Sequence, residues 1–200
     1  MLRTFARGED SSPVKVMDPT KADVDYVVKG IGNGLTAPHD LECESDVKAL
    51  VWLLSESVAQ RLRESRLRCR TISVGARWAR DLTGYSRQTT VRVPTCLTRD
   101  IANFAMGLLR ANQPFDKDHA LRAIHVRVTN LVPMDVPVQC DLFGDAAEVV
   151  RMERLDLAID ALRVRFGNTC VKRAVELTDD VMSGLYIKRD NTVHPIGFLR

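Results

Sequence analysis

The segment that decides the fold reads CRTISVGARWA at 69–79, DLTG at 81–84 and YSRQTTVRV at 85–93. Its first part alternates apolar and polar side chains, the period of a half-buried strand. Its last part alternates in the same way, with Val91 and Val93 expected to face inward. The short stretch between them suits a hairpin loop. The segment therefore predicts two paired strands, each with one apolar and one polar face.

A helix and a further strand are expected upstream of this hairpin. Val24–Val28 is rich in β-forming residues and runs into the glycine-containing stretch Lys29–Thr36. A helix of about 20 residues follows, and Ser45 is its expected N-cap. The apolar residues of this helix recur at helical spacing: Val47, Leu50, Val51, Leu54, Val58 and Leu62.

A second helix and a last strand are expected downstream. Thr98 is the expected N-cap of a helix with Ile101, Ala105, Leu108 and Leu109 on one face. The last strand, over 121–130, alternates again. Its inward residues are Ile124, Val126 and Val128, and its other face shows Ala123, His125, Arg127 and Thr129.

The element order is therefore β-α-β-β-α-β. An α+β domain accommodates this order most economically, with one four-stranded, mostly antiparallel sheet that carries both helices on one face. The opposite face would be exposed to solvent and present small polar residues among arginines. Such a surface is suited to contact with a nucleic-acid backbone. The residues expected there are Ser73, Arg77, Gln88, His125 and Arg127.

Composition and motifs exclude several classes. With 45% hydrophobic and 28% charged residues, the 200-residue chain has enough apolar material for a core. No apolar run approaches the roughly 18 residues of a membrane helix. Five cysteines and four histidines are scattered without metal-ligand spacing, which predicts a reduced cytoplasmic protein without metal. Gly30-Ile-Gly-Asn-Gly34 lacks the following helix of a dinucleotide site, and Asp179-Asp180 points in diverging directions. No catalytic constellation is found.

Positive charge is concentrated in one block. Residues 61–99 contain ten Arg, no Lys and only Glu64 and Asp81, whereas the whole chain has a net charge of +3. Arginine makes planar, bidentate contacts to phosphate. The block predicts a nucleic-acid-facing surface, and a solvated helix end followed by charged strands is the alternative.

Several quoted segments occur together in one known family: Lys29-Gly-Ile-Gly-Asn33, Val58-Ala-Gln-Arg-Leu-Arg63, Arg70-Thr-Ile-Ser-Val74, Ser86-Arg-Gln-Thr-Thr-Val91 and Ile124-His-Val-Arg-Val-Thr-Asn-Leu131. They resemble the C-terminal half of Y-family translesion DNA polymerases, of the bacterial DNA polymerase IV and ImpB–MucB–SamB type. The resemblance implies four parts. Residues 1–24 would be the end of the thumb and a linker, and 25–132 the little-finger domain. Residues 133–144 would be a second linker, and 145–200 a helical tail.

The resemblance also implies a function without catalysis in this chain. The family's palm, which holds Mg²⁺ for the DNA-directed DNA polymerase reaction, lies outside the matched part, so no cofactor is expected here. In this family the little finger binds primer–template DNA by contacting the sugar–phosphate backbone of the DNA. The residues that would make this contact are Lys29, Gly30, Gly32, Asn33, Ser73, Arg77, Ser86, Arg87, Gln88, Arg122, His125, Arg127 and Thr129.

A second partner is implied by Gln139-Cys-Asp-Leu-Phe143, which matches the Q-x-x-L-F peptide that bacterial polymerases use to dock on the sliding clamp. Leu142 and Phe143 would enter an apolar pocket while Gln139 bonds at its rim. The alternative is that both apolar side chains pack on their own domain. A monomer without membrane contact is expected.

Two further alternatives stay open. The chain could be a stand-alone protein-interaction or regulatory adaptor of similar fold that does not hold DNA, and His125 could be an ordinary surface residue.

A last helix is expected from Asp145 to Phe166. Its apolar stripe of Met152, Leu155, Ile159, Leu162 and Phe166 is expected to pack on its own domain rather than on a partner.

Overall fold

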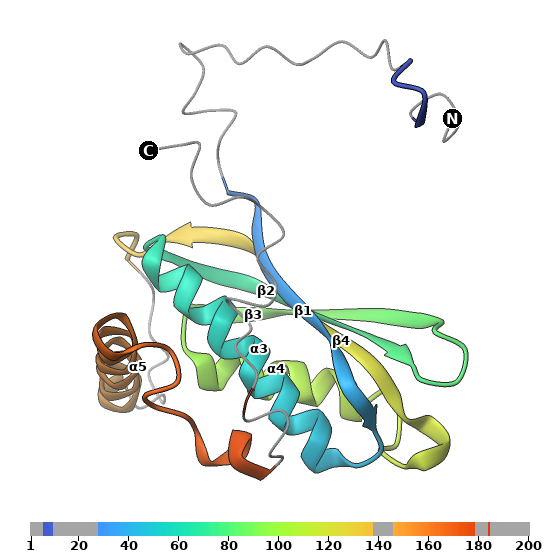
Figure 1. Ribbon diagram of the computed structural model, residues 1–200. Coiled ribbons are helices and arrows are strands. Elements are labelled where there is room, and N and C mark those ends of the chain that lie inside the picture. The colour runs from blue at the N-terminus through green and yellow to red at the C-terminus, as the bar shows by residue number, and fades with distance from the viewer. Residues whose placement is uncertain (1–5, 10–27, 138–145, 179–183, 185–200) are drawn as a thin grey trace.

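A four-stranded antiparallel sheet forms the centre of the computed structural model, which describes residues 6–9, 28–137, 146–178 and 184. The strand order is β1-β4-β2-β3, and every neighbouring pair is antiparallel. Two helices, α3 and α4, lie on one side of the sheet (Figure 1). The predicted element order and the α+β class are confirmed. The bounds are β1 (Gly30–Leu41), α3 (Glu44–Glu64), β2 (Leu67–Trp78), β3 (Gly84–Thr95), α4 (Thr98–Arg110) and β4 (Leu121–Pro133).

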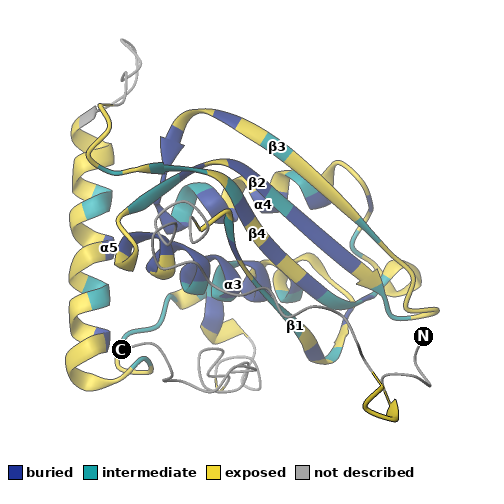
Figure 2. Cartoon of the chain, turned by 90° about the horizontal axis from the view of Figure 1, so that it is seen from above, coloured by how far each residue is buried: buried dark blue, intermediate teal, exposed yellow. Residues whose placement is uncertain are grey.

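The core lies between the sheet and these two helices. All six apolar residues predicted for the first helix are fully buried, as are Ile72, Val74 and Val126 on the strands. Buried and exposed residues alternate along β4 from Ile124 to Val128, whereas the neighbouring strand β2 is buried over most of its length (Figure 2). Burial of this single continuous layer is the main stabilising contribution, because hydrophobic stabilisation scales with the apolar area removed from water.

Both predicted N-caps are wrong. Helix α3 begins one residue earlier than Ser45, and Cys43 occupies the N-cap position without a side-chain hydrogen bond. Helix α4 begins at Thr98 itself. The backbone N–H of Thr98 donates to the carboxylate of Asp156, 3.0 Å away and 58 residues later in the chain. A tertiary contact thus replaces the local cap that such a residue usually supplies.

Two details of the strands also differ from the expectation. Lys29 precedes the first strand, which begins at Gly30 and includes the glycine-rich stretch; Val24 lies outside the described residues. Val93 is 41% exposed rather than inward. The register between β2 and β3 shifts between the pairs Cys69↔Thr95 and Thr71↔Thr90, and such an irregularity breaks the alternation.

A third helix, α5 (Ala146–Phe166), lies beside this domain and is followed by the 3-10 helix η3 (Ala174–Thr178). A shorter 3-10 helix, η2 (Lys117–His119), precedes β4. The predicted helix is confirmed, but its apolar stripe is largely uncovered: Leu155, Leu162 and Phe166 are exposed. The helix faces its own domain with charged residues instead, including buried Asp156 and Arg163. No helix within the described ranges is long and apolar enough to cross a membrane.

Candidate nucleic-acid interface

The side of the sheet opposite α3 and α4 carries sixteen residues in four rows. The strand register defines each row, read from β1 through β4 and β2 to β3. Not one of the sixteen is acidic, and not one is a large aliphatic residue. The rows are Gly30, Thr129, Thr71 and Thr90; Gly32, Arg127, Ser73 and Gln88; Gly34, His125, Gly75 and Ser86; and Thr36, Ala123, Arg77 and Gly84. We call this surface the open face.

Glycines make the β1 side of the open face flat. A Cβ added at Gly34 would lie 2.8 Å from the Cβ of His125, and one added at Gly30 would lie 2.9 Å from Cγ2 of Thr129. Real Cβ atoms avoid such distances, so the side chains of β4 occupy the space that β1 leaves free. A ligand can therefore come close to the backbone of β1.

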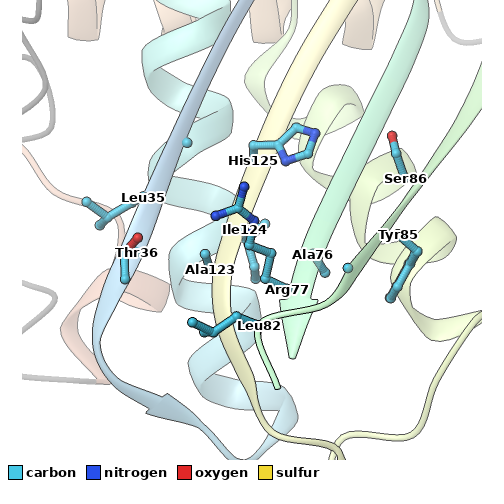
Figure 3. A pocket seen from close by; sticks show the side chains of 12 residues that line it. Leu35, Thr36, Ala76, Arg77, Leu82, Tyr85, Ser86, Ala123, Ile124 and His125 are labelled. Carbon is cyan, nitrogen blue, oxygen red and sulfur yellow. The ribbon is translucent and has the colours of Figure 1, made fainter. Parts of the chain in front are cut away.

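His125 lies near the middle of the open face. Its ring extends from β4 across β2 at Gly75, where a Cβ would lie only 1.8 Å from Cε1 of the imidazole (Figure 3). Burial of the ring, followed by the positive charges of Arg77 and Arg127, lowers the pKa of His125 below its ordinary value of 6.5. The imidazole is therefore neutral at pH 7, and the formal charge of the open face comes from the two arginines.

Arg77 and Arg127 are both exposed, and they flank His125. The Arg77 side chain extends from the end of β2 over β4 (Figure 3). The backbone beneath Arg127 is held by Ser73, whose Oγ donates to the Arg127 carbonyl at 3.0 Å. A shallow hollow of about 770 Å³ lies between Thr36, Arg77, His125 and Ser86. Polar and apolar residues line it in about equal measure, and its open form suits an extended strand rather than an enclosed small molecule.

Two of the predicted contact residues lie on the other side of the sheet. Arg87 is in register with Val74, and its Nε donates to Oδ1 of Asn112 near the end of α4 at 2.8 Å. Asn33 faces α3, where its Nδ2 donates to Oγ of Ser57 at 2.9 Å. Neighbouring residues on a strand point to opposite faces, so Ser86, Arg87 and Gln88 cannot all reach one surface.

The remaining predicted residues are divided between the open face and its margins. Arg122 forms an ion pair with Asp40 at 3.2 Å, and Lys29 is exposed just before β1. Nine of the predicted residues are on the open face: Gly30, Gly32, Ser73, Arg77, Ser86, Gln88, His125, Arg127 and Thr129. The motif residues Gln139, Leu142 and Phe143 lie outside the described residues.

The predicted contact residues do not include Gly34, Gly75 and Thr71, which also lie on the open face. Strand alternation alone predicts Gly75 and Thr71, because they share the parity of Ser73 and Arg77. The close approach of the His125 ring to Gly75 depends on which strands are neighbours, and no local pattern encodes that. Among the described residues, no group of His, Cys, Asp or Glu side chains could hold a metal ion.

The arginine block does not form one surface. Arg63, Arg68 and Arg99 each pair with a carboxylate of α5, at Asp160, Glu153 and Glu148 respectively. Arg61 donates to the carbonyl of Gly32. Within the block, Arg77 alone belongs to the four rows of the open face. The block therefore does not form the single basic surface expected of it, and its contact with nucleic acid stays a prediction.

This geometry defines the class of protein: an α+β domain whose open sheet face is polar and carries no acidic residue. The chain belongs to the impB/mucB/samB family C-terminal domain, whose model matches residues 28–142. That range begins just before β1 and ends within the segment that precedes α5. Helix α5 and η3 lie beyond it.

Similar proteins bear names consistent with this family. DNA polymerase IV of Acetivibrio thermocellus is 38% identical over 178 residues, which cover 89% of this chain and 43% of that protein. DNA polymerase IV of Moorella thermoacetica is 35% identical over 178 residues, 89% of this chain and 41% of that protein. The chain thus spans about two fifths of the length of these relatives.

A solved structure is also similar. It is described as a complex of the beta-clamp processivity factor and the little finger domain of PolIV. The match covers 57% of this chain and 99% of that one, with a TM-score of 0.43 and 18% sequence identity.

Proposed function

We propose that this chain is the DNA-binding and clamp-docking part of an error-prone translesion DNA polymerase that acts in DNA repair and damage bypass. Membership of the family and the names of the relatives support the polymerase assignment. One structural observation carries the DNA-binding role: the open face places Arg77 and Arg127 beside small polar residues and glycines, without a carboxylate among its four rows.

The proposed grip is to the phosphate backbone. Arg77 and Arg127 offer forked N–H donors that match phosphate oxygens. Hydroxyls such as Ser86 and Thr90 can donate to further phosphates, and the glycines of β1 let the DNA backbone come close. Such contacts position a duplex without specifying its sequence. Comparable affinity for unrelated duplexes is therefore expected.

The charge of the open face limits the strength of this grip. Each neutralised phosphate contributes about −0.9 to the slope of log affinity against log salt. Two arginines therefore predict a slope near −2, at the low end for DNA-binding proteins, and a modest affinity. A slope near zero would instead favour the adaptor, which holds a protein partner and not DNA.

The test compares arginines on opposite sides of the sheet. Duplex binding is measured by fluorescence anisotropy for the wild type, for Arg77→Ala with Arg127→Ala, and for Arg87→Ala. The double variant should lose affinity alike on every duplex and bring the salt slope close to zero. Arg87→Ala is the matched control, because Arg87 is exposed on the helix side, and it should bind as the wild type does. An equal loss for Arg87→Ala would exclude the open face as the DNA-binding surface.

Clamp docking rests on Gln139-Cys-Asp-Leu-Phe143. Leu142 and Phe143 could each contribute about 1.5–3 kcal/mol if the clamp buried them. Calorimetry with Leu142→Ala and Phe143→Ala combined should therefore show at least about a 100-fold weaker affinity for the clamp, at about 1.4 kcal/mol per tenfold. Thermal unfolding is the control. Unchanged clamp affinity would exclude the docking role, and a large fall in Tm would show that both side chains pack on their own domain.

The polymerase reaction is proposed for the whole protein and not for these 200 residues. The sequence supplies no constellation of carboxylates that would hold two metal ions for nucleotidyl transfer. Primer extension with Mg²⁺ and nucleotides, carried out with this chain alone, should give no product. Template-dependent extension by the purified chain would overturn the proposed division of roles.

A further inference from the structure

The contact between α5 and the little-finger domain is built from buried charges. The guanidinium of Arg63 on α3 reaches Asp160 at 2.6 Å and Asp156 at 3.2 Å, and its side chain is 5% exposed. The same guanidinium donates to the carbonyl of Cys96 at 2.9 Å, just before α4 begins. One arginine therefore joins α3, α4 and α5. We call residues 146–178, which include α5 and η3, the arm.

A second cluster lies further along the arm. Glu56 of α3 accepts from Arg163 of α5 at 2.7 Å and from Arg173 at 2.5 Å. Arg173 also reaches Asp156 at 2.7 Å, which links the two clusters. The Glu56 and Arg163 side chains are 6% and 8% exposed. At this burial each charge needs a partner, because an unpaired buried ion is strongly destabilising.

The positive and negative charges of the two clusters are equal in number, and one further carboxyl group has no arginine to balance it. Three arginines face three carboxylates: Arg63, Arg163 and Arg173 against Glu56, Asp156 and Asp160. Glu176 of η3 is the fourth carboxyl group; it is 4% exposed, and its Oε1 has no hydrogen-bond partner among the residues that the structure describes. An ionised Glu176 would add an uncompensated negative charge opposite Glu56.

Apolar contacts add little to this attachment. The large apolar residues of α5 lie mostly on its outer side: Leu157 is 54% exposed, Val164 80% and Phe166 60%. Helix α5 is therefore attached mainly through ion pairs between arginines and carboxylates.

We propose that the arm is a proton-linked latch, which docks on α3 and α4 when Glu176 is protonated and is released when Glu176 ionises. This device goes beyond the proposed DNA and clamp functions and depends on neither. The charged groups that act on Glu176 are Glu56 from α3, Arg163 from α5, and Arg173 from the connection between α5 and η3. Arg173 also pairs with Asp156 of α5.

The direction of the pH dependence follows from the environment of Glu176. Burial, and then the charge and hydrogen bonding of Glu56, raise the pKa of Glu176 from 4.5 to about 8; the two arginines act in the opposite sense. A carboxyl group with a raised pKa in the docked state stabilises docking fully below its free pKa of 4.5. This contribution is lost as the pH rises toward 8. Docking should weaken by roughly a few hundred-fold between pH 5 and pH 8.

The experiment uses the full chain with Trp78→Phe, which leaves Trp52 as the only tryptophan. The Arg173 guanidinium lies 5.4 Å from the Trp52 ring centroid, so release of the arm exposes this indole. Acrylamide quenching of Trp52 and hydrogen-exchange protection of residues 146–178 are measured at pH 5 and pH 8. Quenching should rise, and the protection factors of the arm should fall by up to roughly a few hundred-fold, while those of β2 and β4 stay constant.

Three variants decide the proposal. Glu176→Gln should keep the arm docked at both pH values. Glu148→Gln is the matched control, because Glu148 lies on the arm but its side chain is 48% exposed, and it should retain the wild-type pH dependence. In Glu56→Gln, Arg63, Arg163 and Arg173 face Asp156, Asp160 and Glu176, so an ionised Glu176 is compensated. The arm of this variant should therefore lose most of its pH dependence, while β2 and β4 stay protected. The wild-type pH dependence in Glu176→Gln or in Glu56→Gln would overturn the latch.

Discussion

The imidazole of His125 lies across Gly75 of the neighbouring strand, in space that any other residue at position 75 would fill with its Cβ. The two residues are partners in the β2–β4 register. Because Gly75 has no side chain, the ring can lie against the sheet between Arg77 and Arg127. This contact gives the open face a flat centre and keeps His125 neutral at pH 7.

Replacing Gly75 with alanine should therefore move the ring. The added Cβ would overlap Cε1, and the flexible imidazole can turn away, so the pKa of His125 should rise toward its ordinary 6.5. The free energy of unfolding should change by less than about 1 kcal/mol, because relief of a strand glycine offsets part of the cost. NMR titration measures the pKa. Gly107→Ala is the control, since its Cβ would meet nothing within 4 Å, and it should leave the titration unchanged.

DNA affinity should increase when His125 is protonated. Its pKa is lowered, so a third positive charge appears on the open face only as the pH falls below 6.5. Bound phosphate favours the charged form. Affinity for a duplex should accordingly be stronger at pH 5.5 than at pH 7.5, and the salt slope should be steeper by about 0.9. His125→Gln should remove both differences. An equal pH response in that variant would place the titrating group elsewhere.

Arg63 should be a major contributor to stability. Its replacement with methionine leaves Asp156 and Asp160 buried near one another without their shared partner. The free energy of unfolding, measured by urea denaturation, should fall by about 3–5 kcal/mol. Arg110→Ala tests a surface pair with Glu44, in which both side chains are about half exposed, and should cost less than about 1 kcal/mol. A loss below about 1 kcal/mol in Arg63→Met would contradict a central role for this arginine.

The cysteines should differ in reactivity. Burial raises the pKa of the Cys69 thiol to about 12, and burial also raises the pKa of Cys96. Cys43 and Cys170 are exposed. The thiolate is the reactive form, so iodoacetamide at pH 8 should label the exposed pair rapidly and the buried pair only after denaturation. Mass spectrometry of the peptides measures this. Rapid labelling of Cys69 in the native protein would contradict the structure of the core.

The alternation of apolar and polar residues was sufficient to predict the sheet and its two covering helices. Ile124, Val126 and Val128 are buried as predicted, and His125 and Arg127 lie on the opposite face. This worked because each strand has one face toward a core and one toward water, and a period of two records that difference locally.

The distribution of charge along the sequence was a poorer guide to the structure. Ten arginines between 61 and 99 predicted one basic surface, yet Arg63, Arg68 and Arg99 are neutralised by α5, which begins 47 residues after the block ends. The position of Arg87 on the helix side of the sheet, in contrast, can be predicted from the sequence. Arg87 and Gln88 are neighbours on a strand, so their side chains point to opposite faces.

The sequence by itself determined the element order, the core residues and the family to which the chain belongs, because these depend on short-range periodicity and on motifs. Tertiary structure alone decided the strand order β1-β4-β2-β3, the position of His125 over Gly75 and the pairing of α5 with the arginine block. Apart from the β2–β3 hairpin, which the sequence predicted, each of these joins residues more than 40 positions apart. No local pattern specifies which distant charge or glycine will be the neighbour. The decisive quantity is burial, which exists only once the layers have packed together.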